Sequence, residues 1–242
     1  MLNAWKEAGK IDGKQFIVKT IVTSYIMDAI AAKFGVKCFN VLTGFKYIAE
    51  IIRNLEGKEK FIAGGEESYG YLVGDFVRDK DAVGSCAFIA EMAAYAKDKG
   101  RSLYDFLIDM YVEFGFYKEK LISITKKGKS GADEIKAMME NYRNNPPRSL
   151  AGSNVVKMMD YELRKETDLV TGKVSEIALP KSDVLQFLTE DGSLISARPS
   201  GTEPKIKFYV SVNEKLPAKD QFKQTDNKLD EKIDKIVKDL GL

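Results

Sequence analysis

The stretch QFIVKTIV at residues 15–22 is followed by VKCFNV at 36–41 and by KFIA at 60–63. All three segments are short, mostly apolar and rich in β-branched residues, which is typical of strands buried on both faces of a sheet. Two segments with helical periodicity, at about 24–34 and 45–55, separate them. This alternation predicts a three-layer α/β domain in which helices cover a mixed sheet.

The loops that follow these strands form the first candidate binding site. Crossovers between parallel strands are right-handed, so the carboxyl ends of the strands share one edge, beyond which ligands bind. Thr23 or Ser24, either of which is expected to cap the first helix, lies there with Thr43-Gly44 and Lys46. The third loop is GGEESYGY at 64–71. Its carboxylates can accept hydrogen bonds from sugar hydroxyls, and its glycines let the backbone curl around a polyol.

A charged run, DFVRDKD at 75–81, comes next. Judged from its residues, this run is a solvated linker whose Asp81 caps a helix expected at about 81–99. Ser102 to Asp105 then resembles a capping box and opens a further helix, which ends at Gly115. The methionine and aromatic residues of that helix are interpreted as core residues rather than cofactor contacts.

The pattern changes near Tyr117, and strands joined by turns replace the alternation of strands and helices. A polar connection is expected at 164–173 and an amphipathic closing helix at 218–240. The later strands are predicted at 120–125, 155–161, 184–188, 194–197 and 206–212. We therefore predict two domains, the three-layer mixed-sheet α/β domain at 1–117 and a smaller α+β domain with an antiparallel sheet at 118–242.

The stretch RPSGTEPKIK at 198–207 joins the last two predicted strands. The guanidinium of Arg198 can form a fork onto two oxygens, and Ser200 and Thr202 add hydroxyl donors. Gly201 allows backbone N–H groups to approach a ligand closely. This combination suits a dianionic phosphate, and the alternative is a surface turn with ordinary lysines.

The composition argues against several classes of function. With 38 basic and 36 acidic residues the net charge is +2, so no nucleic-acid partner is expected. The absence of histidine excludes His-based metal sites and Ser-His-Asp triads. The basic turn at 126–131 lacks the spacing of a P-loop and is interpreted as a solvated joint. Cys38 and Cys86 are expected to be reduced core residues. No apolar run is long enough for a membrane span and the first residues lack a signal-peptide core, so we expect a cytoplasmic protein.

Two of these loops resemble motifs of one known family. GGEESYGY at 64–71 resembles the sugar-binding loop of the α-D-phosphohexomutases, the phosphoglucomutase/phosphomannomutase superfamily, and RPSGTEPKIK at 198–207 resembles their phosphate-binding loop. VKTIVTS at 18–24, TGFK at 43–46 and VGDFVRDKDAV at 73–83 are similar to the same branch. The resemblance covers essentially the whole chain and implies the third and fourth domains, the C-terminal half, of a four-domain enzyme.

The resemblance also implies roles for individual residues. Those that it assigns to the sugar are Glu66, Ser68, Thr43, Gly44, Lys80 and Arg78. The resemblance assigns a second set to the phosphate that is not being transferred: Arg198, Ser200, Gly201 and Thr202. A basic residue of the following strand is expected to help, and Lys207 fits that place better than Lys205.

Other parts of the family's machinery do not match this sequence. The family carries a phosphoserine in its first domain and binds Mg²⁺ on an Asp-rich loop of its second, and neither motif occurs here. We therefore expect no magnesium ligand and no phosphoryl carrier in this chain, which should be inactive without the N-terminal domains. The implied reaction interconverts glucose or mannose 1-phosphate and 6-phosphate through a bisphosphate, with a sugar bisphosphate as activator. A phosphopentomutase and a stand-alone sugar-phosphate-binding module remain alternatives.

Overall fold

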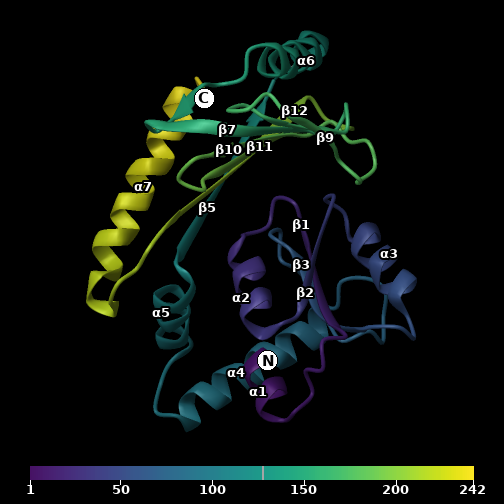
Figure 1. The fold of residues 1–242 in the computed structure, drawn as a ribbon, viewed down its shortest axis with the longest axis vertical. Coiled ribbons are helices and arrows are strands. Elements are labelled where there is room, and N and C mark those ends of the chain that lie inside the picture. The colour runs from purple at the N-terminus through teal and green to yellow at the C-terminus, as the bar shows by residue number, and fades with distance from the viewer. Residues whose placement is uncertain (127) are drawn as a thin grey trace. The chain divides into compact units, whose positions relative to one another are not determined.

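A computed structural model describes residues 1–126 and 128–242. The chain divides into two compact units, Met1–Gly115, coloured from purple to teal in Figure 1, and Phe116–Leu242, coloured from teal to yellow. The sequence placed the boundary after residue 117. The second unit, which was expected to be the smaller, has the longer chain of the two. Within the described residues, no helix combines the length and the apolar character that crossing a membrane requires.

The first unit contains a four-stranded mixed sheet in the order β2-β1-β3-β4. The first three strands are parallel, as predicted, and β4 runs antiparallel to β3. The strands are β1 (Gln15–Thr20), β2 (Lys37–Val41), β3 (Lys60–Glu66) and β4 (Gly70–Val73). The prediction ended the third strand at residue 63 and missed β4, because it interpreted GGEESYGY as an open loop. That stretch forms a β-hairpin.

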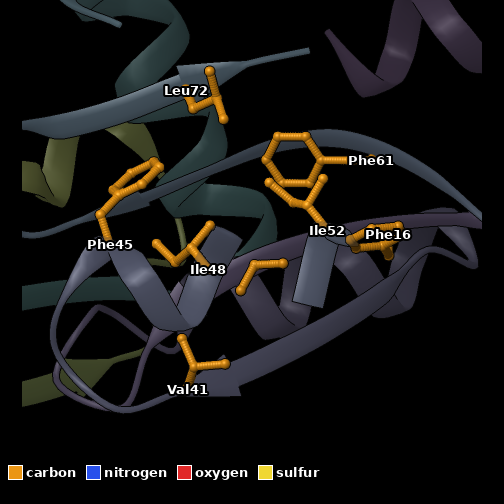
Figure 2. Packing of buried hydrophobic residues seen from close by; sticks show 8 residues of the cluster. Phe16, Val41, Phe45, Ile48, Ile52, Phe61 and Leu72 are labelled. Carbon is orange, nitrogen blue, oxygen red and sulfur yellow. The ribbon is translucent and has the colours of Figure 1, made fainter. Parts of the chain in front are cut away.

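Helices lie on both faces of this sheet. They are α1 (Leu2–Glu7), α2 (Ile26–Phe34), α3 (Phe45–Leu55), α4 (Ala82–Asp98) and α5 (Leu103–Phe114). One face packs against α3, where Phe45, Ile48 and Ile52 meet apolar side chains of the strands (Figure 2). The other face packs against α1 and α2 around Ile17 and Ile62. The unit is therefore a three-layer α/β domain, as the sequence predicted.

The helix caps test the local predictions. Asp81 accepts a hydrogen bond from the Gly84 N–H at 3.0 Å and caps α4, and Ser102 and Asp105 form the capping box of α5. The predicted cap of α2 was wrong, because the N-cap residue is Tyr25 and its side chain makes no capping hydrogen bond. The Ser24 hydroxyl instead accepts a hydrogen bond of 3.4 Å from the Ile26 N–H.

The expectation that α5 contributes core residues was also wrong. The structure describes every residue of α5, and none of them is buried. Leu103 and Leu107 are exposed. The spacing of its apolar residues gives α5 an apolar side, and the rest of the first unit covers that side only in part. In α4, similarly, Ser85 and Ala96 are the buried residues.

The two cysteines differ in environment, and one of them contradicts the prediction. Cys38 is half-buried in β2, but Cys86 is exposed on α4 rather than part of the core. Burial raises the pKa of the Cys38 thiol to about 12, and the Asp28 carboxylate acts in the same direction. Cys38 should therefore supply very little thiolate at neutral pH.

We expect iodoacetamide at pH 8 to alkylate Cys86 readily and Cys38 on the order of 100-fold more slowly, since the thiolate is the reacting species. Peptide mass spectrometry of timed samples measures both rates. In guanidinium chloride the two rates should converge. Equal rates in the folded protein would contradict the assignment of Cys38 to a shielded position.

The second unit is built on an eight-stranded antiparallel sheet, as far as the structure describes it, in the order β5-β12-β11-β10-β7-β8-β9, with β6 beside β7. Its strands are β5 (Phe116–Thr125), β6 (Ser149–Leu150), β7 (Ser153–Asp160), β8 (Lys165–Asp168), β9 (Val174–Glu176), β10 (Leu185–Thr189), β11 (Leu194–Pro199) and β12 (Lys205–Glu214). The predicted meander is present. The polar connection expected at 164–173 was wrong in part, since β8 lies within it and pairs with β7 and β9.

The helices of this unit are α6 (Gly128–Asn144), the short η1 (Lys219–Gln221) and α7 (Phe222–Asp239). The apolar face predicted for the closing helix is buried against β12 and β5. Lys118 of β5 also reaches α7, with its ammonium 2.7 Å from Asp230. Of the basic turn interpreted as a solvated joint, Lys126 follows β5, residues 128–131 belong to α6, and Lys127 lies outside the described residues.

Candidate functional site

The parallel strands of the first unit bring two predicted sugar-binding residues into direct contact. Gly44 follows β2 and is the N-cap of α3, and Glu66 ends β3. The Gly44 N–H donates a hydrogen bond of 2.8 Å to Glu66 Oε1. Gly44 has a φ of 119°, which disfavours other residues at this position. Thr43, the preceding residue, is half-buried beside this contact.

The second carboxylate of the GEES sequence is held separately. Glu67 Oε2 accepts hydrogen bonds from the hydroxyls of Thr20, at 3.2 Å, and Thr23, at 3.4 Å. Those two hydroxyls are themselves 2.9 Å apart. Glu67 thus ties the hairpin to the turn after β1, a role that the sequence did not indicate, although Thr23 was placed at this edge.

Ser68 lies in the turn between β3 and β4 and is exposed. The next residue, Tyr69, has a φ of 66° and a side chain that is 86% exposed. A left-handed conformation is uncommon for a tyrosine and marks a constrained turn. The tip of the hairpin therefore presents a hydroxyl and an aromatic ring to solvent, next to the two anchored carboxylates.

Lys80 crosses the hairpin at Gly70. A Cβ atom at Gly70 would lie 2.5 Å from Lys80 Cδ, so any other residue there would displace the lysine side chain. The Lys80 ammonium lies 5.0 Å from the centre of the Phe45 ring and 3.0 Å from Asp79 Oδ1. Because Gly70 pairs with Glu66, Lys80 passes directly over the end of β3 that carries the candidate carboxylate.

Arg78 occupies a different position from Lys80. Its guanidinium pairs with Glu56 at 2.8 Å and donates to the carbonyl oxygen of Asp75. The charged run therefore does more than link two elements, since it is fixed to the end of α3. Its Asp81 also caps α4, as the linker interpretation expected.

A pocket of about 880 Å³ lies between α3 and the charged run. Three of the predicted residues, Gly44, Arg78 and Lys80, line it. Two further cations, Lys46 and Arg53, also line it, and only Lys46 was noted in the sequence, without a role. They are seven residues apart on α3, a spacing that places both on one helix face. Four basic side chains and the carboxylates of Glu50 and Asp79 line the pocket beside the Glu66–Gly44 contact, and the excess of positive charge suits an anionic ligand.

Lys19 is a polar residue that the sequence did not single out. It lies within the apolar strand β1, and its side chain is only 2% exposed. Its ammonium pairs with Asp28 Oδ2 at 3.1 Å, donates to the Thr23 carbonyl oxygen at 3.1 Å and lies 4.6 Å from the centre of the Tyr25 ring. These contacts fix the turn after β1, on which Thr23 stands.

The candidate phosphate loop of the second unit begins and ends within strands. Arg198 lies in β11 and Lys207 in β12, directly opposite each other in the antiparallel register. Residues that face each other in this way, and residues two apart on one strand, project from the same face of a sheet. Arg198, Lys205 and Lys207 therefore share one face. Of the two lysines, Lys207 is the cross-strand partner of Arg198. The Lys205 ammonium instead lies 3.8 Å from Glu203 Oε2.

The turn between these strands carries the predicted hydroxyl donors. The Ser200 hydroxyl accepts hydrogen bonds from the N–H groups of Thr202, at 3.4 Å, and Glu203, at 3.3 Å. Gly201 and Thr202 are exposed, and a Cβ atom at Gly201 would meet nothing within 4 Å. The turn is thus open on the side where a ligand would approach the backbone.

Among the residues that the structure describes, no three His, Cys, Asp or Glu side chains are close enough together to hold a metal ion.

Comparison with protein families assigns both units. The model for "Phosphoglucomutase/phosphomannomutase, alpha/beta/alpha domain III" matches residues 1–114, and the model for "Phosphoglucomutase/phosphomannomutase, C-terminal domain" matches residues 130–231. The chain belongs to the phosphoglucomutase/phosphomannomutase family. It contains domain III and the C-terminal domain of that family.

Curated relatives of the chain are named phosphoglucomutase. The protein of Staphylococcus epidermidis is 41% identical over 199 residues, which are 82% of this chain and 36% of the relative. The protein of Staphylococcus haemolyticus is 38% identical over 207 residues, which are 86% of this chain and 38% of the relative. The chain thus spans somewhat more than a third of the length of these relatives.

Solved structures show the same fold at lower identity. The open form of pp63/parafusin, a phosphoglucomutase from Paramecium, has a TM-score of 0.59 and 21% identity, covering 93% of this chain and 38% of that one. A phosphoglucomutase/phosphomannomutase family protein of Burkholderia thailandensis has a TM-score of 0.54 and 13% identity, covering 99% of this chain and 40% of that one. Both support the mixed α/β architecture with two sheets.

Proposed function

We propose that this chain is the substrate-recognition half of a cytoplasmic phosphohexomutase. The full enzyme would interconvert the 1-phosphate and 6-phosphate of glucose or mannose through a bisphosphate intermediate. The observation that carries the proposal is the contact between Glu66 and Gly44, two residues from different loops that the family resemblance assigns to the same sugar. The curated relatives bear the name phosphoglucomutase, which favours this class of reaction.

The proposed sugar contacts follow from the hydrogen-bonding capacity left at the hairpin. Glu66 Oε1 already accepts the Gly44 N–H. Its second oxygen can accept a hydrogen bond from a sugar hydroxyl, and the exposed Ser68 hydroxyl can both donate and accept. Hydroxyls repeat around a hexose, so these groups can bind it in two orientations, as a mutase that turns its intermediate over requires. Lys80 and Arg78 add positive charge for a phosphate ester.

The proposed phosphate contacts use the strand pair of the second unit. Arg198 can form a bidentate contact with two phosphate oxygens, and Lys207 opposite it adds a second positive charge. Ser200 and Thr202 supply hydroxyls, and Gly201 leaves the backbone N–H groups of the turn accessible. In phosphoryl transfer, binding the phosphate that does not react positions the one that does.

The proposed division of labour leaves the reacting groups outside this chain. In the family, the phosphoserine and Mg²⁺ belong to the first two domains, whereas the matched models are those of domain III and the C-terminal domain. We propose that the chain binds a sugar phosphate but has no mutase activity without those domains. A phosphopentomutase would use the same phosphate loop with a different sugar, and a stand-alone binding module would use both loops without any reaction.

The proposal predicts that Arg198→Ala weakens binding of glucose 1-phosphate about 10- to 100-fold, because a charge-assisted hydrogen bond contributes about 1.5–3 kcal/mol. Isothermal titration calorimetry measures the change, with mannose 1-phosphate and ribose 1-phosphate titrated in parallel to rank the sugars. Arg148→Ala, which removes an exposed guanidinium elsewhere in the second unit, serves as the control. Equal Kd values for the Arg198→Ala variant and the parent would refute the role of the loop.

A further inference from the structure

The turn between β3 and β4 contains a residue that its backbone conformation disfavours. Glu66 pairs with Gly70, so residues 67–69 form a three-residue loop. The last residue of such a loop is commonly left-handed and is usually glycine, which has no Cβ atom to clash with the backbone. Here that residue is Tyr69, with a φ of 66°. Holding a tyrosine in this conformation costs free energy on folding.

The side chain of Tyr69 makes no contact that offsets this cost. It is 86% exposed, and no hydrogen bond, ion pair or ring contact joins it to another of the residues that the structure describes. Tyr71 on β4 provides the contrast. Its ring lies across Gly65, where a Cβ atom would be 2.6 Å from Tyr71 Cδ1, and it is 43% exposed. The hairpin therefore packs the ring of Tyr71 and leaves that of Tyr69 available to a ligand.

The neighbours of Tyr69 indicate the chemistry of that ligand. A strained residue whose side chain serves no packing purpose is characteristic of functional sites. Ser68, the preceding residue, is exposed. Glu66 Oε1 accepts the Gly44 N–H, and Oε2 lies beside Gly70, where a Cβ atom would be 3.4 Å from it. A carboxylate, a hydroxyl and an aromatic ring thus occur within four residues, and together they suit a sugar.

These three groups would contact different parts of a hexose. The sugar hydroxyls lie around the rim of the ring and can bind the carboxylate and the serine hydroxyl. The axial C–H groups form an apolar face, which makes no hydrogen bonds. An aromatic ring suits that face, because its π-system is negative and the C–H hydrogens are slightly positive. Apolar contact is also non-directional, so it can persist when the sugar turns over.

We infer that Tyr69 is a sugar-binding residue whose ring packs on the C–H face of the hexose. The inference rests on the proposed function, in which this hairpin binds the sugar. It adds a residue that distinguishes a cyclic sugar phosphate from an open-chain polyol phosphate. Burial of the ring against the ligand would offset the cost of the left-handed backbone at Tyr69.

The test compares two substitutions that separate the ring from the backbone strain. Tyr69→Phe keeps both, whereas Tyr69→Asn removes the ring and tolerates the left-handed conformation. In calorimetric titrations with glucose 1-phosphate, we expect a Kd within about twofold of the parent for Tyr69→Phe and about 3- to 10-fold higher for Tyr69→Asn, the range that an aromatic contact supports. Tyr95→Ala removes a 57% exposed ring from α4 and should leave the Kd unchanged.

A second ligand and a stability measurement separate recognition from folding. The open-chain ligand sn-glycerol 3-phosphate has hydroxyls and a phosphate but no ring, so the Tyr69 variants should bind it as the parent does. Urea unfolding followed by the fluorescence of Trp5 should give Tyr69→Asn a midpoint at least as high as that of the parent, because strain is relieved. A purely structural residue would lose stability instead. Tyr69→Gly replaces Tyr69→Asn if the latter does not fold.

Three results would overturn the inference. The first is unchanged binding of glucose 1-phosphate by Tyr69→Asn while Arg198→Ala still weakens it, which would leave the proposed function standing without Tyr69. The second is equal weakening of sn-glycerol 3-phosphate by Tyr69→Asn. The third is a Tyr69→Phe variant as weak as Tyr69→Asn, which would assign the effect to the phenolic hydroxyl. A parent chain that does not bind glucose 1-phosphate would refute the proposed function and the inference with it.

Discussion

Asp28→Ala is expected to destabilise the first unit by about 3–5 kcal/mol, because it leaves the buried ammonium of Lys19 without its carboxylate partner. The Lys19 side chain is 2% exposed, whereas that of Asp28 is 31% exposed. Asp28→Ala and Lys19→Met should therefore lower the free energy of unfolding by unequal amounts. Lys19→Met should cost less, because the Asp28 side chain is 31% exposed and its Oδ1 still accepts a hydrogen bond of 2.9 Å from Asn40, although Oδ2 is buried.

Urea unfolding followed by the fluorescence of Trp5 measures this difference. Trp5 is the chain's only tryptophan and packs against the apolar cluster of the first unit, so it reports on that unit. The double variant Lys19→Met/Asp28→Leu removes both charges and should be more stable than Asp28→Ala. If Asp28→Ala unfolded within about 1 kcal/mol of the parent, the ion pair would not have the structural role described.

Phe16→Ala should destabilise the same unit by about 3–5 kcal/mol through loss of buried apolar area and formation of a cavity. Phe16 is 1% exposed, and its ring lies 5.6 Å from the ring centres of both Phe39 and Phe61. It is the second residue of β1, the strand that lies between β2 and β3, which carry those two rings. Truncation therefore removes contacts to both neighbours at once.

The control for this prediction is Phe76→Ala, which deletes the same side chain at a position that is 70% exposed. Its effect should stay within about 0.5 kcal/mol, as is usual for surface substitutions. The loss of unfolding free energy in Phe16→Leu should lie between the losses in Phe16→Ala and Phe76→Ala. Similar unfolding midpoints for Phe16→Ala and Phe76→Ala would show that Phe16 does not hold the core as described.

The order of the elements in the first unit could be predicted, because each strand and helix there has an apolar pattern of the right period. The strand β4 and the end of β3 could not. Their residues include glycines and glutamates, which have low strand propensity. These segments form strands because tertiary contacts favour the pairing. At Gly64, for example, a Cβ atom would lie 2.6 Å from the Val18 carbonyl oxygen, so the close approach of β3 to β1 depends on a glycine there. A glycine that permits close approach of two strands looks, in a sequence, like a loop glycine.

Burial was harder to predict than secondary structure. The apolar residues of α4 and α5 correctly indicated helices, and they also led to the expectation that α5 residues and Cys86 lie in the core. A period of 3.6 residues tells which side of a helix is apolar, but not whether the covering surface belongs to the same unit. The exposure of Cys86 follows from its position on α4, which only the fold reveals.

For the candidate site, the motifs identified the strand ends and their chemistry. The pairing of Glu66 with Gly44 follows from the parallel order of β2 and β3 around β1. The cations Lys46 and Arg53 were not assigned, because their relation to the charged run depends on how α3 packs beside it. Lys19 was missed for a similar reason, since its partner Asp28 lies on another element.

The hydrogen bond between Gly44 and Glu66 has a consequence for ligand entry. A free glutamate side chain loses rotamer freedom when it binds a ligand, and this loss opposes binding. Glu66 has already lost much of that freedom on folding, because one oxygen is fixed by a backbone amide. The Gly44 amide proton therefore serves as a spectroscopic probe of the carboxylate. Its chemical shift should report whether Glu66 keeps this partner or exchanges it when a sugar arrives.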